Sequence, residues 1–216
     1  MPFTWRDDAS LSAGGSIADV GSHAYDTIRW LLGQEARRLL THASVLAPAK
    51  LDLGTINLTE ALAWGQTPPA GESKATVDAP LRKGTACDYA AIAFEMEGGA
   101  VGSIVLSHAP YLRKGLAPEL ELHGSEASLA VDRVSGELRL VRPSGEVEVI
   151  DRVPFAGFGN RFAQHVFPAI RARREAAGQE ATDAVHPGLD DGYRVQCFTD
   201  AALQSAASGT WTEVNE

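Results

Sequence analysis

The sequence predicts an α+β fold, a large, open and mainly antiparallel sheet with helices packed on one face. Two observations lead to this prediction. Apolar residues recur at helical spacing near the start and the end of the chain, and the stretch between them contains short alternating segments separated by turn residues. Because tight turns join antiparallel neighbours, this order of elements indicates the α+β class.

The first predicted element is an amphipathic helix over residues 15–32. Gly33 follows it at the position where a glycine commonly ends a helix. The apolar stripe of this helix consists of Ile17, Val20, Ala24, Ile28, Leu31 and Leu32.

A serial meander of strands is predicted next. Glu-Gly-Gly at 97–99, Gly-Ser-Glu at 124–126 and Pro-Ser-Gly at 143–145 are the turn signals. Residues 67–83, rich in proline, glycine and serine, are expected to form a surface loop. The predicted strands are 39–46, 88–95, 100–107, 116–123, 127–131, 138–141 and 147–150.

The chain is expected to end with helices over 162–177 and 187–207 and a short edge strand at 211–214. No composition shift marks a domain boundary, so residues 1–216 are predicted to form a single substrate-binding and oligomerisation domain. The apolar face of its sheet predicts a homo-oligomer.

Composition narrows the class of protein. The formal net charge of −9 argues against a nucleic-acid partner, since phosphate binding needs clustered Lys and Arg. Cys87 and Cys197 make no disulfide framework or CxxC site. No apolar run is long enough to cross a bilayer, and the first residues do not have the pattern of a signal peptide. We therefore expect a cytoplasmic protein without a membrane partner.

A dinucleotide-binding motif is not found. Gly157-Phe158-Gly159 lacks the third glycine of G-x-G-x-x-G and no apolar strand leads into it. The sequence predicts that this chain alone binds no cofactor.

The densest functional signal is the spacing of Asp19, His23 and Asp26 at i, i+4 and i+7, which places them on one helix face. A carboxylate beside an imidazole can orient the ring for general acid/base work on a hydroxyl. Two other interpretations compete. Asp19 and His23 could bind a metal, but no spacing selects a third ligand among His108, His123 and His165. They could also be structural, with Asp19 favoured near a helix N-terminus. Spacing alone favours the structural role.

Other candidates for substrate binding are Trp5 and Arg6, which precede the helix, and Asn160, which follows a glycine-rich loop. Arg6 could pair with a substrate oxygen or with Asp19. The alternatives are a packing Trp, a surface Arg and an ordinary helix start at Asn160. His108, directly after a strand, is interpreted as structural.

The order of several motifs closely resembles the C-terminal domain of the glucose–fructose oxidoreductase, inositol dehydrogenase and rhizopine-catabolism (Gfo/Idh/MocA) family. The matching blocks are Trp5-Arg6, Ala13-Gly14-Gly15, Asp19-x-Gly21-x-His23-x-x-Asp26, Arg29-Trp30-Leu31-Leu32-Gly33, the hairpin around Gly98-Gly99, Gly124-Ser125-Glu126-Ala127 and Asp191-Gly192-Tyr193-Arg194.

The resemblance implies a substrate domain of an NAD- or NADP-dependent oxidoreductase that acts on a sugar, a polyol or a related CH–OH compound. It implies that Asp19 and His23 are the substrate-binding acid and the acid/base histidine, without a metal. The family's Rossmann domain, with its catalytic lysine in Glu-Lys-Pro, has no counterpart here, so the chain is expected to be inactive alone. A stand-alone, non-catalytic ligand-binding or dimerisation module is the alternative.

Overall fold

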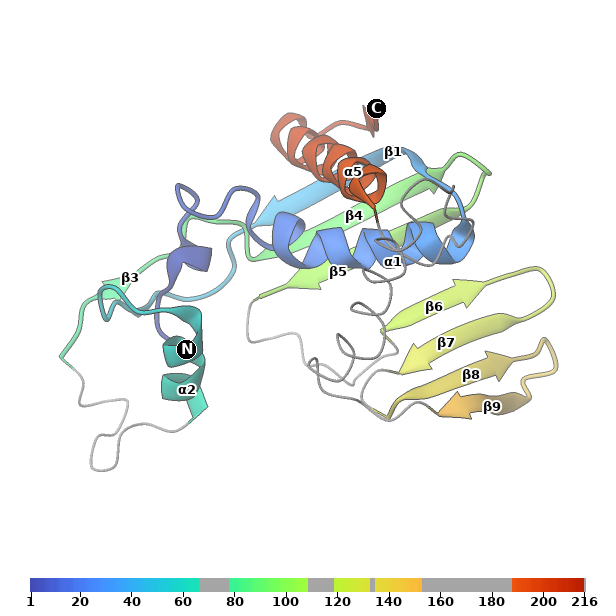
Figure 1. The fold of residues 1–216 in the computed structure, drawn as a ribbon, viewed down its shortest axis with the longest axis horizontal. Helices are drawn as coiled ribbons and strands as arrows, with labels where there is room; N and C mark the ends of the chain where they lie inside the picture. Colours follow the sequence, from blue (N-terminus) through green and yellow to red (C-terminus); the bar gives the residue numbers. More distant parts are fainter. Residues whose placement is uncertain (67–77, 109–118, 133–134, 153–187, 216) are drawn as a thin grey trace, which may run out of the picture. The chain divides into compact units, whose positions relative to one another are not determined.

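The fold is known from a computed structural model, which describes residues 1–66, 78–108, 119–132, 135–152 and 188–215 (Figure 1). The chain divides into two compact units. The first consists of Met1–Pro110 and Gly188–Glu216, and the second of Tyr111–Pro187. Among the helices in the described ranges, none has both the length and the apolar character that crossing a membrane requires.

The first unit contains a four-stranded antiparallel sheet in the order β10-β1-β4-β5. Its strands are β1 (Ala36–Ser44), β4 (Tyr89–Met96), β5 (Val101–Ser107) and β10 (Thr212–Glu213). Met96 N–H donates to the carbonyl of Ala100 at 2.8 Å, which closes the predicted turn between β4 and β5. The short edge strand expected at the end of the chain is β10, which pairs with β1.

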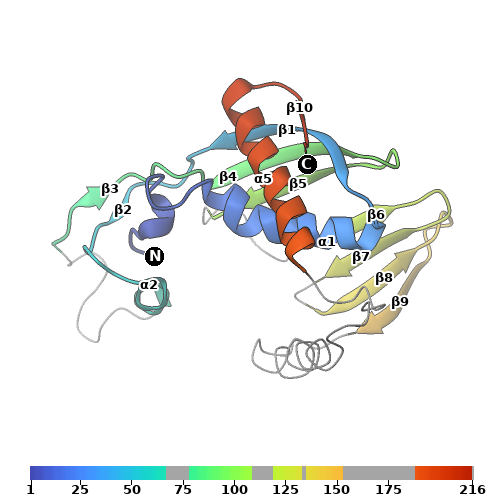
Figure 2. The same ribbon diagram turned by 45° about the horizontal axis from the view of Figure 1, so that its top comes forward.

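Helices cover one face of this sheet (Figure 2). They are the π-helical segment η2 (Ile17–Gly21), α1 (Ser22–Leu32) and α5 (Leu189–Ser208). The core lies between these helices and the alternate residues of β4 that point toward them, such as Ile92 and Phe94. Within it the rings of Tyr25 and Phe198 stack with their centroids 3.8 Å apart. Burial of such side chains contributes roughly 1.5–3 kcal/mol each.

The predicted first helix is confirmed as one continuous helix over residues 15–32. It ends at Gly33, whose φ of 62° requires the left-handed conformation that glycine adopts without strain, and whose N–H donates to the carbonyl of Arg29 at 2.8 Å. The π-helical turns within it were not predicted, because apolar spacing does not distinguish them from α-helical turns.

The second unit contains another four-stranded antiparallel sheet in the order β6-β7-β8-β9. Its strands are β6 (Leu120–His123), β7 (Ser128–Asp132), β8 (Glu137–Val141) and β9 (Val147–Arg152). Gly145 takes a φ of 85° in the turn between β8 and β9, where the sequence predicts a hairpin. The predicted mainly antiparallel α+β fold is therefore confirmed, with the described strands divided between sheets.

Four short elements were missed. The 3₁₀ turn η1 (Trp5–Asp7) precedes the first helix, and β2 (Lys50–Leu51) pairs with β3 (Leu81–Arg82), which lies inside the expected loop. Helix α2 (Leu58–Gln66) carries an overlooked capping signal: Asn57 and Glu60 exchange backbone-to-side-chain hydrogen bonds of 2.9 and 3.1 Å. The helix expected at 162–177 and most of the expected loop lie outside the described residues.

Candidate functional site

Two glycines seat η2 against the sheet and so determine where Asp19 lies. A Cβ atom at Gly15 would come within 2.2 Å of the carbonyl oxygen of Cys87, just before β4. The next residue, Ser16, donates its N–H to that oxygen at 2.8 Å. At the other end, a Cβ atom at Gly21 would come within 2.9 Å of Leu106 on β5. Both glycines therefore allow the start of the helix to lie close against the sheet.

This placement brings Asp19 against two cationic or titratable side chains. Oδ1 of Asp19 accepts a hydrogen bond of 3.0 Å from Nη2 of Arg6. Oδ2 of Asp19 lies 3.1 Å from Nε2 of His108, which follows the end of β5. The second approach has ion-pair distance without hydrogen-bond alignment, since Nε2 of His108 has no well-oriented acceptor among the described residues. The three side chains are only partly exposed, at 30%, 32% and 21% for Asp19, Arg6 and His108.

The segment before the first helix holds Arg6 in place. The Asp7 carboxylate accepts a hydrogen bond of 2.9 Å from the N–H of Thr4, which closes the turn η1. Asp7 also forms a 2.6 Å ion pair with Lys50. The Arg6 guanidinium lies 5.5 Å from the centre of the Trp5 ring, within the range of a cation–π contact. Trp5 and Arg6 are thus brought together with Asp19.

A backbone hydrogen bond fixes the position of His108. Its N–H donates to the carbonyl of Asp88 at 2.7 Å, and the Asp88 side chain is itself buried, accepting hydrogen bonds from the backbone of Leu46 and Ala47. Burial lowers the pKa of the His108 imidazole, and the charge of Asp19 opposes this effect. His108 is therefore an imidazole that favours its neutral form beside a carboxylate.

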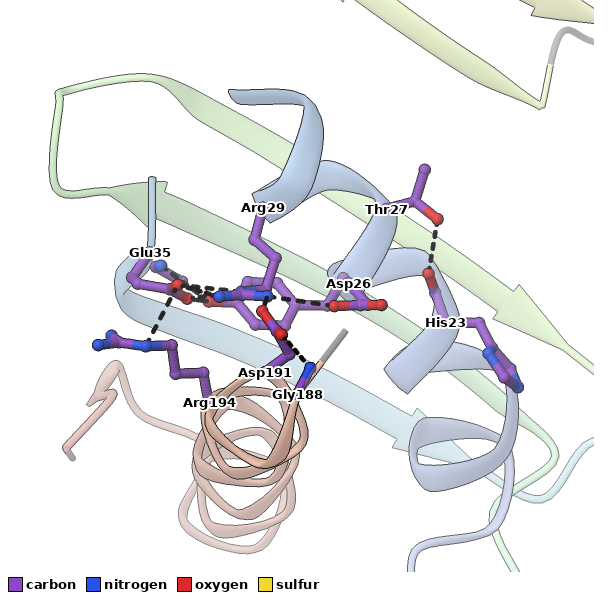
Figure 3. A network of polar contacts seen from close by, with 10 residues as sticks. His23, Asp26, Thr27, Arg29, Glu35, Gly188, Asp191 and Arg194 are labelled. Carbon is purple, nitrogen blue, oxygen red and sulfur yellow. Dashed lines mark hydrogen bonds and ion pairs between the residues drawn. The ribbon is translucent and has the colours of Figure 1, made fainter. Parts of the chain in front are cut away.

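His23 lies apart from this arrangement. Its side chain is exposed, and among the described residues no hydrogen bond or ion pair joins it to Asp19. Asp19 belongs to a π-helical turn, whose hydrogen bonds close at i+5, so the stacking of i and i+4 in a regular α-helix does not apply across it. Figure 3 shows the imidazole of His23 directed away from the neighbouring ionic network.

Asp26, the third residue of the predicted helix face, belongs to that network. Its carboxylate lies 3.3 Å from Arg29, which also pairs with Glu35 at 2.6 Å and with Asp191 at 2.7 Å (Figure 3). Hydrogen bonds to Glu35 and then to Asp191 raise the pKa of Arg29, against the effect of burial. Arg29 therefore joins α1 to the start of α5, and Asp26 pairs with Arg29 instead of facing Asp19.

Two further outcomes concern the candidate residues. Asn160 lies outside the described residues, so its predicted contact with substrate stays a prediction. His108, interpreted as structural from its position after a strand, has its imidazole beside Asp19. The signal that could have placed His108 near the helix start was its position directly after β5. That strand pairs with β4, and the residue just before β4, Cys87, lies against Gly15.

The helix start at Gly14-Gly15 is the described feature most similar to a phosphate cradle, and it does not fit a dinucleotide. Its amides are already used: Ser16 N–H donates to Cys87 and Ile17 N–H to Gly14. A helix N-terminus binds phosphate through free N–H groups, which these are not. In the described ranges, no three His, Cys, Asp or Glu side chains gather as metal ligands.

The chemistry available is that of hydroxyl recognition. A carboxylate accepts hydrogen bonds from hydroxyls, and an imidazole gives or takes a proton near neutral pH. A carboxylate, a guanidinium, an imidazole and an exposed indole lie close together in an α+β domain, an arrangement that can bind a small polar molecule.

Comparison with known proteins agrees with this class. The sequence model described as "GFO/IDH/MocA C-terminal domain" matches residues 1–130. The chain therefore belongs to the GFO/IDH/MocA family, as its C-terminal domain.

The individual relatives have low sequence identity to this chain. Levoglucosan dehydrogenase of Pseudarthrobacter phenanthrenivorans is 25% identical over 228 residues, covering 99% of this chain and 55% of its own length. An oxidoreductase domain protein from Kribbella flavida has a TM-score of 0.72 at 21% identity, and the structure of levoglucosan dehydrogenase in complex with NADH and levoglucosan has 0.70 at 20%. Both structures are matched over 100% of this chain and over 55% and 54% of their own. The chain thus spans about half the length of these relatives.

Proposed function

We propose that this chain is the substrate-binding domain of an NAD(P)-dependent oxidoreductase that acts on a CH–OH group of a sugar or polyol. The carboxylate of Asp19, held by Arg6 at the start of a family C-terminal domain, is the observation that carries this proposal. Its support from the relatives is that one of them is a levoglucosan dehydrogenase with a structure in complex with NADH and levoglucosan.

In this proposal Asp19 binds a substrate hydroxyl. A carboxylate neutralised by a guanidinium still has lone pairs for hydroxyl donors, because each carboxylate oxygen accepts more than one hydrogen bond. Lys50 and Asp7 form a second neutral pair nearby. Because both ion pairs are neutral overall and His108 favours its neutral form, the charges around Asp19 cancel. Such surroundings suit an uncharged polyhydroxy ligand better than a sugar acid.

His23 is proposed to exchange the proton of the reacting hydroxyl. Its exposed imidazole, one turn after Asp19 on the same helix, is free of side-chain hydrogen bonds among the described residues and available to a ligand. Residues outside this chain are proposed to hold the nicotinamide cofactor, since the described helix start does not fit a dinucleotide.

The test is binding of uncharged sugars and polyols to the 216-residue chain, measured by saturation-transfer NMR with levoglucosan, inositol and glucose as the first probes. We expect binding that is lost in Asp19→Asn and retained in His42→Asn, a matched change of an exposed histidine on β1. Titration with NADH should show no micromolar binding. Absence of any carbohydrate binding by the wild-type chain, or tight binding of NADH, would contradict the proposal.

We also propose that the chain self-associates through the face of its first sheet that lies opposite the helices described above. Val101 and Val105 on β5 are 77% and 57% exposed on that face, while the alternate residues Ile104 and Leu106 are buried beneath the helices. Apolar strand surface of this kind commonly marks an interface. Light scattering at micromolar concentration should give at least a dimer, and Val105→Lys should shift it to monomer. A wild-type monomer would count against this proposal.

A further inference from the structure

His108 is a half-buried imidazole beside Asp19, and neither the sequence motifs nor the proposed reaction assigns it a role. Its Nε2 atom is enclosed by protein and lies 3.1 Å from Oδ2 of Asp19. Nε2 therefore faces the Asp19 carboxylate and not a ligand, so its effect on a bound molecule is expected to act through Asp19.

The Asp19 carboxylate is hydrogen-bonded on one side and approached on the other. Arg6 donates to Oδ1 from the segment before the helix, and His108 approaches Oδ2 from the end of β5. A carboxylate with one partner can still swing about its side-chain torsions, whereas two partners from separate elements determine the plane of its oxygens.

The imperfect alignment of His108 has an energetic consequence. A buried donor without an acceptor costs about 1–3 kcal/mol, so a small rotation that completes the hydrogen bond to Asp19 is favourable. Polar contacts at binding sites are often poorly aligned without ligand and tighten in the complex.

We propose that His108 is a positioning residue for Asp19, holding one carboxylate oxygen while Arg6 holds the other, so that Asp19 meets the hydroxyls of a sugar or polyol in one orientation. This inference rests on the proposed function. The charged groups that act on His108 are Asp19 and Asp7, which favour its protonated form, and Arg6 and Lys50, which disfavour it.

The first test is the titration of His108 in the 216-residue chain, followed through the imidazole nitrogens by NMR. If Asp19 and His108 act as a pair, Asp19→Asn lowers the pKa of His108, because it removes a nearby negative charge. Arg6→Met should raise it. A His108 titration unchanged by Asp19→Asn overturns the proposal.

The second test is carbohydrate affinity. His108→Gln retains an N–H donor at a similar distance, whereas His108→Leu removes it. We expect His108→Leu to weaken binding of the uncharged probe about tenfold, as for a lost hydrogen bond to a charged group. His108→Gln should restore most of the affinity, and His42→Leu on β1 should change nothing.

The outcomes separate the two proposals. If Asp19→Asn abolishes binding while His108→Leu binds as wild type, the proposed function stands and the positioning role is wrong. If the wild-type chain binds no carbohydrate, the proposed function fails and the positioning role fails with it. Unchanged melting temperatures of the variants exclude loss of folding as the cause.

Discussion

Nη1 of Arg29 lies 2.7 Å from Oδ1 of Asp191, although 162 positions separate the two residues in the chain. The same guanidinium binds Glu35 through Nε and Nη2. Backbone N–H donation from Gly188 and then the contact with Arg29 lower the pKa of Asp191. This ion network joins α1, the start of β1 and the first turn of α5.

Removal of Arg29 should destabilise the first unit strongly. The Arg29 side chain is 12% exposed, and Arg29→Met leaves Glu35 and Asp191 without their main cation. Loss of hydrogen bonds to charged groups at this partly buried position should cost about 1.5–3 kcal/mol. The free energy of unfolding in urea measures it. Arg37→Met is the matched control, because Arg37 is 52% exposed and Glu95 keeps its contact with Arg38. Equal losses in both variants would contradict a structural role for the network.

Gly15→Ala should be more destabilising than Gly33→Ala. Both glycines have positive φ, 52° and 62°, and a side chain in that conformation costs about 1–2 kcal/mol. Only Gly15 adds an overlap, because its Cβ would lie 2.2 Å from the oxygen of Cys87 while nothing lies within 4 Å at Gly33. Thermal unfolding of the two variants measures the difference. Indistinguishable melting temperatures would show that η2 can move away from the sheet.

Phe198→Ala should cost about 3–5 kcal/mol of unfolding free energy. The ring is 1% exposed and stacks on Tyr25 at an interplanar angle of 6°. Phe198→Leu retains most of the volume but not the stacking, so its loss should be clearly smaller. Chemical denaturation of both variants provides the measurement, and a loss under about 1 kcal/mol for Phe198→Ala would contradict the assigned core.

Stability should depend on pH through His108. Burial lowers its pKa below the ordinary 6.5, so the unfolded chain takes up the proton more readily than the folded one. The contribution is therefore complete above pH 6.5 and is lost as the pH falls through 6.5 and then through the pKa of the folded state.

Urea unfolding of the wild type and of His108→Gln between pH 8 and pH 5 tests this dependence. The variant should lose stability less steeply below pH 6.5. His42→Gln, which removes an exposed imidazole, should follow the wild type. A wild-type curve parallel to that of His108→Gln would contradict the burial of His108.

Local patterns in the sequence were sufficient for most of the described elements. The helix over 15–32 with its glycine end, the hairpin of β4 and β5, and the edge strand β10 were predicted from periodicity and turn residues. These signals act over a few residues, where spacing and backbone preference decide the structure. The pairing of Arg6 with Asp19 was also among the predicted alternatives.

The grouping at the site was decided by tertiary structure. Spacing predicted that Asp19 lies beside His23 and Asp26. In the folded chain Asp19 instead contacts Arg6 and lies close to His108, and Asp26 pairs with Arg29. The physical reason is the π-helical turn, which changes which side chains share a helix face. Gly15 and Gly21 allow this part of the helix to pack closely against the backbone of Cys87 and the side chain of Leu106. Helical spacing predicts only which residues are neighbours along one helix. The imidazole beside Asp19 belongs to His108, which follows β5, and it lies near Asp19 only because the sheet packs against the helix.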